Sequence, residues 1–226
     1  DWPGGRMTVT RTMPDSSRGP EDQGRPATYR NTETHWWDGS QLYGSSTERQ
    51  RLVRTDPATG AILADGKLML TADGHLPIEQ GAKVQGTELS GVNGNWWIGL
   101  SAFHTLFARE HNAIVDRLTI DHPGASGEWL FQKARLVNAA LLAKIHTVDW
   151  TPALINSPEG RTAMRFNWWG LLGEHFSRGY GRRGMGDLLS GIPGSTHDHH
   201  AAPYAMTEEF TSIYRMHSLM PDEYSF

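Results

Sequence analysis

Two long amphipathic segments, separated by a short Pro- and Gly-containing stretch, constrain the fold of this chain more than any other feature. In residues 96–118 apolar side chains recur every three or four positions, and the same spacing returns in residues 129–148. That period is typical of an α-helix with one apolar face. Ser126 lies in the intervening DHPGASGE and is a suitable N-cap for the second helix. We therefore expect two helices packed as an antiparallel hairpin. Their apolar stripes are Phe103, Leu106, Phe107, Ile114, Val115 and Leu118 in the first, and Leu130, Ala134, Val137, Leu141 and Ile145 in the second.

The rest of the chain adds shorter elements to a mainly α fold. Residues 1–33 are rich in Pro, Gly, Asp and Arg and predict a loop with one short strand at residues 7–11. Asp-Gly dipeptides between short apolar runs in residues 61–78 predict a small β-hairpin region. A short helix is expected at residues 161–176, and another at residues 208–219, where the following proline acts as a stop.

Composition excludes several classes of function. The chain has 226 residues, 38% of them hydrophobic, which is enough for a packed core. A net charge of -4 with scattered basic residues argues against nucleic acid as a partner, because phosphate binding needs clustered Lys and Arg. No apolar run approaches the roughly 20 residues of a membrane span, no leader opens the chain and nothing indicates membrane association, so we expect a cytoplasmic location. Without cysteine there is no thiolate ligand or nucleophile.

Two histidine-containing segments are candidates for chemistry. Residues 197–200 read HDHH, and clustered imidazoles bind zinc, copper or nickel, although four successive side chains rarely point at one ion. In the predicted C-terminal helix, Tyr214 and His217 are three positions apart and therefore share one face. For an arbitrary Tyr-x-x-His pair, the ordinary interpretation is two core residues with hydrogen-bonded polar tips.

The surroundings of that pair change the interpretation. FTSIYRMHSLMPD resembles the proximal-histidine helix of the animal haem peroxidase and cyclooxygenase superfamily, and the fatty-acid alpha-dioxygenase branch most of all. The resemblance runs from about residue 30 to residue 222 and implies a peroxidase-cyclooxygenase-like helical domain. Four further stretches match the family in the same order: THWWDGSQLYGSS (Thr34–Ser46), SGVNGNWWIGLSAFHTLFAREHNAIVDRL (Ser90–Leu118), WLFQKARLVNAALLAKIHTVDWTPALI (Trp129–Ile155) and HAAPYAMTEEF (His200–Phe210).

The resemblance assigns roles to individual residues. It implies that His217 ligates the iron of haem b and that Tyr214 forms a catalytic radical. A neutral imidazole on a packed helix suits an axial ligand whose orientation must be fixed. His200 matches a histidine that contacts the substrate carboxylate. His104 and His111 belong to a helix signature of the family and are expected to be structural.

A calcium site is expected at the start of the resemblance. Thr34, Trp36, Asp38 and Ser40 offer oxygen atoms at alternate positions, from hydroxyl, backbone carbonyl and carboxylate groups. Such a set around one carboxylate suits Ca²⁺ better than zinc. The alternative is an Asp-Gly turn with a capping serine. The resemblance implies one more ligand, an aspartate beside a distal histidine, and the sequence does not supply it.

Departures from the family pattern define what is missing. No histidine precedes Thr34, and the downstream helices with a carboxylate-binding arginine are absent. We therefore interpret residues 1–226 as a partial catalytic domain whose haem pocket is completed by partner segments. Gly94 stands where the family usually has arginine, and Ala205 where it has threonine, so two polar contacts to an anion are lost.

Three functional hypotheses follow. The first is a haem-dependent fatty-acid alpha-dioxygenase in which Tyr214 abstracts hydrogen beside the carboxylate and O2 adds at C2. The second is a haem peroxidase that uses H2O2 with small reductants. The third is a non-catalytic scaffold that keeps the helices and the calcium loop.

Overall fold

The computed structural model describes residues 13–29, 36–82, 85–94 and 97–180. The chain divides into two compact units, residues 1–35 with 203–226 and residues 36–202. The described part of the first unit is a loop, with an antiparallel bridge between Pro14 and Tyr29 and a single 3-10 turn, η2 (Pro20–Asp22). The strand expected at residues 7–11 and the helix expected at residues 208–219 lie outside the described residues. One partial domain over the whole chain therefore remains a prediction.

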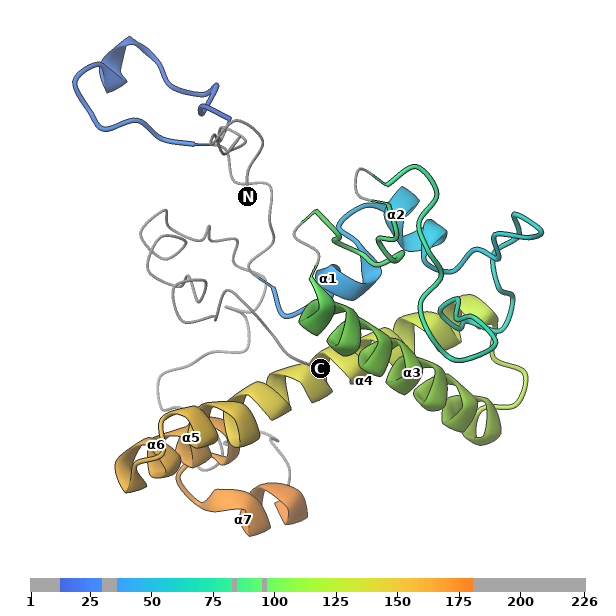
Figure 1. The fold of residues 1–226 in the computed structure, drawn as a ribbon. Coiled ribbons are helices and arrows are strands. Elements are labelled where there is room, and N and C mark those ends of the chain that lie inside the picture. Colours follow the sequence, from blue (N-terminus) through green and yellow to red (C-terminus); the bar gives the residue numbers. More distant parts are fainter. Residues whose placement is uncertain (1–12, 30–35, 83–84, 95–96, 181–226) are drawn as a thin grey trace. The chain divides into compact units, whose positions relative to one another are not determined.

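Two long helices form the centre of the second unit (Figure 1). They are α3 (Ile98–Asp121) and α4 (Gly127–Lys144), which pack on each other. The hydroxyl of Ser126 caps α4 by accepting a hydrogen bond from the backbone N–H of Trp129 at 3.2 Å. The two predicted helices and the predicted cap are thus confirmed, with α3 ending three residues later than the apolar spacing indicated.

The buried faces of these helices differ from the predicted apolar stripes. In α3 the predicted core residues Phe103 and Leu106 are exposed, whereas His104 and His111 are buried. In α4 Val137 is exposed and Asn138 is fully buried. A stripe drawn through apolar residues alone misses these polar positions, because hydrogen-bonded side chains can occupy a core. The buried sets are His104, Ala108, His111 and Val115 in α3, and Leu130, Phe131, Ala134, Asn138 and Ala139 in α4.

Beyond α4 the chain continues in short helical pieces. A π-helical segment, η3 (Ile145–Trp150), leads into α5 (Thr151–Leu154), α6 (Pro158–Trp169) and α7 (Gly173–Tyr180). The single helix predicted at residues 161–176 is therefore wrong, because the chain breaks between α6 and α7. Gly170 and Gly173 both have positive φ, 75° and 78°, which glycine adopts without strain.

Residues 36–94 contain two short helices and a long irregular stretch. The helices are α1 (Ser40–Tyr43) and α2 (Thr47–Leu52). The expected β-hairpin region is not confirmed, since the described residues from 53 to 94 hold only two isolated bridges, Thr55 with Ile62 and Ile78 with Glu88. Turns do occur at the Asp-Gly dipeptides, where Gly66 and Gly74 have φ of 85° and 82°. The sequence thus predicted the turns correctly, but not the strands.

A side chain of α3 takes the place of a neighbouring strand. The amide of Asn112 accepts a hydrogen bond from the N–H of Leu68 at 2.8 Å and donates one to the carbonyl of Leu68 at 3.0 Å. Leu68 is buried in the main core, so both of its backbone groups need partners. The irregular stretch is therefore anchored to α3 without a β-ladder.

The core joins the irregular stretch to both long helices. One cluster of buried side chains takes members from α1, the irregular stretch, α3 and α4, and a smaller one lies between α3 and α4. The larger cluster consists of Leu42, Tyr43, Val53, Leu68, Leu76, Leu89, Ala108 and Phe131. Among the described residues, no helix combines the length and the apolar character that crossing a bilayer requires.

Candidate functional site

A chain of buried hydrogen bonds joins α1, α3 and α4. The side-chain N–H of Asn138 donates to the hydroxyl oxygen of Tyr43 at 2.9 Å, and the Tyr43 hydroxyl lies 2.9 Å from Nδ1 of His111. Nε2 of His111 lies 3.1 Å from the carbonyl oxygen of Gly66. A carbonyl can only accept, so Nε2 carries the proton and Nδ1 accepts from Tyr43. All four groups therefore have one consistent direction of donation.

Burial fixes the protonation of this network. It lowers the pKa of His111 to about 4, and the nearby Arg54 cation acts in the same direction, while the bond to Gly66 opposes it. Burial likewise raises the pKa of Tyr43. His111 is thus a neutral ring with both nitrogens engaged, and its predicted structural role is confirmed. It has no nitrogen left for a metal.

His104 occupies a second buried position on α3. Its Nδ1 lies 3.8 Å from a carboxylate oxygen of Glu88, and the other oxygen of Glu88 accepts from the hydroxyl of Ser101. Burial lowers the pKa of His104, and the Glu88 carboxylate partly offsets that effect. The bond from Ser101 ties Glu88 of the irregular stretch to α3, and His104 is buried beside it, which agrees with the structural role expected for His104.

The predicted ion loop lies directly before α1. Oδ1 of Asp38 accepts a hydrogen bond from the N–H of Ser40 at 3.0 Å, as in an Asx turn. Oδ2 of Asp38 is 3.7 Å from the guanidinium of Arg135 on α4, a loose contact that leaves the carboxylate about one-third exposed. Trp36, Asp38 and Ser40 are described, whereas Thr34 lies outside the described residues. One carboxylate with a hydroxyl and a carbonyl is a donor set that fits a hard cation such as Ca²⁺.

Within the described ranges, no group of three or more His, Asp or Glu side chains could hold a metal ion. That finding fits a site built on a single carboxylate, since hydroxyl and carbonyl donors are not among those side chains. The rival HDHH segment at residues 197–200 lies outside the described residues.

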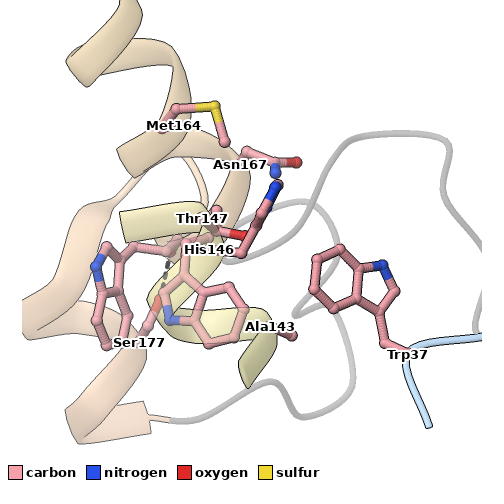
Figure 2. A pocket seen from close by; sticks show the side chains of 9 residues that line it. Trp37, Ala143, His146, Thr147, Met164, Asn167 and Ser177 are labelled. Atoms are coloured by element: carbon pink, nitrogen blue, oxygen red, sulfur yellow. Dashed lines mark hydrogen bonds between the residues drawn. The ribbon is translucent and has the colours of Figure 1, made fainter. Parts of the chain in front are cut away.

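An open pocket of about 630 Å³ lies where η3, α6 and α7 meet. Figure 2 shows Trp37 on a separate segment, across the opening from His146. The two rings are 5.0 Å apart between centroids and tilted by 60°. Most of the lining is apolar or aromatic, and its polar groups come mainly from His146, Thr147 and Asn167. Its lining consists of Trp37, Ala143, His146, Thr147, Met164, Asn167, Trp168, Trp169 and Ser177.

Local structure explains how His146 reaches the pocket. It lies in η3, where the wider π-type turn changes the helical register that α4 would otherwise continue. The hydroxyl of Thr151 donates to the carbonyl of His146 at 2.7 Å and so ties η3 to α5. Such π-segments are frequent at functional sites. An aromatic cavity with a few convergent polar groups is typical of a site for a small apolar ligand.

The structure describes only part of the predicted site. His200, Tyr214 and His217 lie outside the described residues, so their roles remain predictions. The sequence did not predict the pocket, because its lining residues are spread from position 37 to position 177. One signal was available: a histidine, His146, follows the last residue of the apolar stripe, Ile145, and precedes a proline at position 152.

Comparison with known proteins places the chain in a class. A family model described as animal haem peroxidase matches residues 3–226. The chain therefore belongs to the animal haem peroxidase family, which confirms the resemblance seen in its motifs. Membership of this family implies haem as a cofactor.

Individual relatives narrow the class. The chain is 45% identical over 194 residues to "Alpha-dioxygenase PIOX" of Nicotiana tabacum, which covers 85% of this chain and 28% of that protein. It is similar to the crystal structure of Oryza sativa fatty acid alpha-dioxygenase, with a TM-score of 0.76 at 41% identity over 94% of this chain and 32% of the other. A variant of that enzyme with palmitic acid gives 0.73 at 43% identity, over 86% of this chain and 30% of the other. The chain thus spans less than a third of these relatives, and the mainly helical fold is confirmed.

Proposed function

We propose that this chain is part of a haem-dependent fatty-acid alpha-dioxygenase. The observation that carries the proposal is its similarity to alpha-dioxygenases, at 45% identity to a curated relative and a TM-score of 0.76 to a solved one. One of the similar structures is a fatty acid alpha-dioxygenase with palmitic acid. We infer a long-chain fatty acid as the substrate and O2 as the co-substrate.

His217 would hold haem b by ligating its iron. Of the described histidines on α3, His111 is excluded from that role because both of its nitrogens are engaged. Bound haem supplies the one-electron oxidant that converts a nearby phenol into its radical. In a helix Tyr214 lies one turn from His217, on the same face, and is the phenol we assign to this step.

Tyr214 would carry out the hydrogen transfers. Its phenoxyl radical takes a hydrogen atom from C2 of the fatty acid, which leaves an intact phenol and a carbon radical. O2 adds to that carbon and forms a peroxyl radical. The peroxyl oxygen takes the hydrogen atom back from Tyr214, giving the 2-hydroperoxy acid and restoring the phenoxyl radical. No further oxidant is consumed in this cycle.

The described pocket offers a place for the acyl chain. Trp168, Trp169 and Met164 supply apolar contacts, and the His146 imidazole is a hydrogen-bond donor for a carboxylate. His200 remains a second candidate for that contact, as the family resemblance implies. Gly94 has open space around it, with no atom within 4 Å of an added Cβ. Packing therefore does not forbid the arginine that relatives of this kind usually carry there.

Calcium would occupy the loop before α1. Thr34 would bind through its hydroxyl and carbonyl, Trp36 through its carbonyl, Asp38 through its carboxylate and Ser40 through its hydroxyl. Within the described ranges, the Asp38 carboxylate accepts from the Ser40 N–H and makes a long contact to Arg135, which leaves lone pairs for an ion. The ion would fix the entry to α1, whose Tyr43 is part of the buried network.

A haem peroxidase acting on small reductants is the second candidate, favoured by the family to which the chain belongs. A non-catalytic scaffold that keeps the helices and the calcium loop is the third. Oxygen uptake with palmitate separates the first two. Over its complete reading frame the protein should consume O2 and form the 2-hydroperoxy acid, and Tyr214→Phe should abolish both but preserve oxidation of small reductants by H2O2.

Haem uptake separates an enzyme from a scaffold. His217→Ala should lose the Soret band and the pyridine haemochrome, whereas His175→Ala, at an exposed position of α7, should keep both. Unchanged O2 uptake in Tyr214→Phe contradicts the radical mechanism. Absence of haem in the wild-type protein leaves only the scaffold.

A further inference from the structure

The indole of Trp37 and the imidazole of His146 both line the pocket (Figure 2). The ring of Trp37 packs on that of His146 at 5.0 Å between centroids, although the two residues are far apart in the sequence of the second unit. Trp37 is 58% exposed, so most of its apolar surface remains open toward solvent and pocket. A ligand in the pocket could bury that surface, and removing indole area from water is favourable.

The position of Trp37 along the chain links it to a second site. It lies between Trp36 and Asp38, two of the residues that we assign to calcium. Immediately after it the backbone is held firmly: the carboxylate of Asp38 accepts from the N–H of Ser40 at 3.0 Å. Nε of Arg135 on α4 also approaches the Asp38 carbonyl at 3.4 Å. The neighbour of Trp37 on one side, Asp38, is thus held by hydrogen bonds. Both neighbours, Trp36 and Asp38, are proposed ion ligands.

We propose that Trp37 is a positioning residue that couples ion binding in the loop at residues 36–40 to ligand binding in the pocket of His146. An ion held by Trp36, Asp38 and Ser40 restricts the backbone on both sides of Trp37 and keeps its indole against His146. A long-chain carboxylate that packs on the indole then binds more tightly. The inference rests on the proposed function for the identity of the ion and the ligand.

Thermodynamic linkage makes the coupling measurable from either site. If the ion tightens ligand binding by some factor, the ligand must tighten ion binding by the same factor. Couplings of about fivefold are at the lower end of the usual range. We expect a coupling factor of about fivefold, because a single ring contact carries the coupling and the indole is more than half exposed. Removal of the indole should weaken ligand binding, abolish the coupling and leave the ion site intact.

The experiment is a calcium titration by calorimetry on the haem-loaded protein expressed over its complete reading frame. It is done with and without decanoate, under anaerobic conditions and at concentrations where calcium decanoate stays dissolved. In the wild-type protein, saturating decanoate should lower the calcium Kd about fivefold. In Trp37→Ala the calcium Kd without decanoate should stay within about twofold of wild type, and decanoate should no longer change it. Trp37→Phe, which keeps a ring, should restore part of the coupling.

Trp129→Ala is the matched control. Trp129 also packs on a histidine, His122, at 5.0 Å between centroids, but it does not line the pocket. This variant should retain the wild-type coupling. Equal calcium affinity with and without decanoate in the wild-type protein overturns the inference, and so does full coupling in Trp37→Ala.

Activity is recorded separately, so the two proposals can fail independently. Formation of the 2-hydroperoxy acid without any coupling leaves the proposed function standing and removes the role of Trp37. Coupling that depends on Trp37, in a protein that takes up no O2 with fatty acids, supports the role of Trp37 and contradicts the proposed function.

Discussion

The hydroxyl of Tyr43 donates a hydrogen bond to Nδ1 of His111 at 2.9 Å, across 68 positions of the chain and with both side chains fully buried. Edge-to-face packing of the two rings, with centroids 5.4 Å apart, accompanies the bond. Tyr43 ends α1 and His111 lies in the middle of α3, so the pair fastens the segment that follows the ion loop to the central helices. Loss of this bond should therefore lower the stability of the second unit.

Tyr43→Phe should lower the free energy of unfolding by about 1–3 kcal/mol, because it leaves Nδ1 of His111 buried without a donor. It also removes one acceptor of the Asn138 amide, whose Oδ1 already lacks a hydrogen-bond partner within the described structure. Urea unfolding followed by far-UV circular dichroism measures the change. Ser45→Ala, which removes a hydroxyl at an exposed position two residues later, is the control and should change stability by less than about 0.5 kcal/mol. Equal effects of the two substitutions contradict the importance of the buried bond.

Stability should fall as the pH falls below about 6.5. The pKa of His111 is 6.5 when unperturbed and about 4 in the folded chain. Between these values the unfolded state binds a proton that the folded state does not, so lower pH favours unfolding. The free energy of unfolding is therefore unaffected by protonation of His111 above about pH 6.5. It falls by on the order of 3 kcal/mol as the pH drops from there to about 4. His104, whose pKa burial also lowers, acts with the same sign.

His111→Gln tests that assignment, because it removes one titrating group. The wild-type urea midpoint should drop clearly between pH 7 and pH 5, and the variant, although less stable at pH 7, should drop by a smaller amount. A residual dependence is expected from His104. The same drop in both proteins means that His111 is not the group responsible.

The long helices could be predicted from the sequence because their determinants are local. Apolar spacing defines α3 and α4, and Ser126 marks the start of α4 within a few residues of the backbone N–H that it caps. The buried faces could not be predicted in full. His111 and Asn138 are polar, and they are accommodated in the core by hydrogen bonds, among them those to Tyr43, which is far away in sequence.

The irregular stretch and the pocket also depend on contacts between distant residues, which the sequence did not predict. Asp-Gly dipeptides fix turns by themselves, but whether strands form depends on what bonds to the backbone between the turns. Here the Asn112 amide satisfies both backbone groups of Leu68, from 44 positions away. The pocket likewise needs Trp37 to meet His146, a contact that no local pattern indicates. Local sequence patterns thus predicted the helices and turns. The candidate site could not be predicted, because it depends on contacts between residues distant in the sequence.

A third stability prediction concerns Arg49. Its guanidinium donates to both carboxylate oxygens of Glu79 at 2.6 Å, and its Nε donates to the carbonyl of Ser90 at 2.7 Å. The pKa of Glu79 is lowered first of all by these bonds from Arg49. Arg49→Lys keeps the charge but cannot reproduce the planar fork, so it should cost about 1–2 kcal/mol in urea unfolding.

Arg117→Lys is the control for that substitution. Arg117 pairs with Asp121 one helical turn away at 2.9 Å, and its side chain is 75% exposed. Exposed pairs of this kind contribute little to stability, so the control should stay within about 0.5 kcal/mol of wild type. A loss in Arg49→Lys no larger than that in the control means that the fork with Glu79 is not stabilising.

The last prediction concerns the ion loop. Tb³⁺ replaces Ca²⁺ at oxygen sites and becomes luminescent when a nearby indole transfers excitation energy to it. Trp36 contributes a proposed ligand and Trp37 is its neighbour, so excitation of tryptophan should give sensitised Tb³⁺ emission that Ca²⁺ displaces. Asp38→Asn should abolish the emission, because it removes the carboxylate of the proposed site. Chelation of Ca²⁺ should lower the melting temperature of the wild-type protein, since an ion that binds only the folded state stabilises it.

Asp65→Asn separates a site at Asp38 from general attraction of cations to carboxylates. Asp65 is exposed, and its Oδ1 accepts from the N–H of Lys67 at 3.0 Å, so it forms the same kind of Asx turn as Asp38 without neighbouring oxygen donors at alternate positions. This variant should keep the emission, its displacement by Ca²⁺ and the effect of chelation. If Asp38→Asn keeps them as well, the loop is an Asp-Gly turn without an ion, and the carboxylate of Asp38 serves only to accept the Ser40 N–H and meet Arg135.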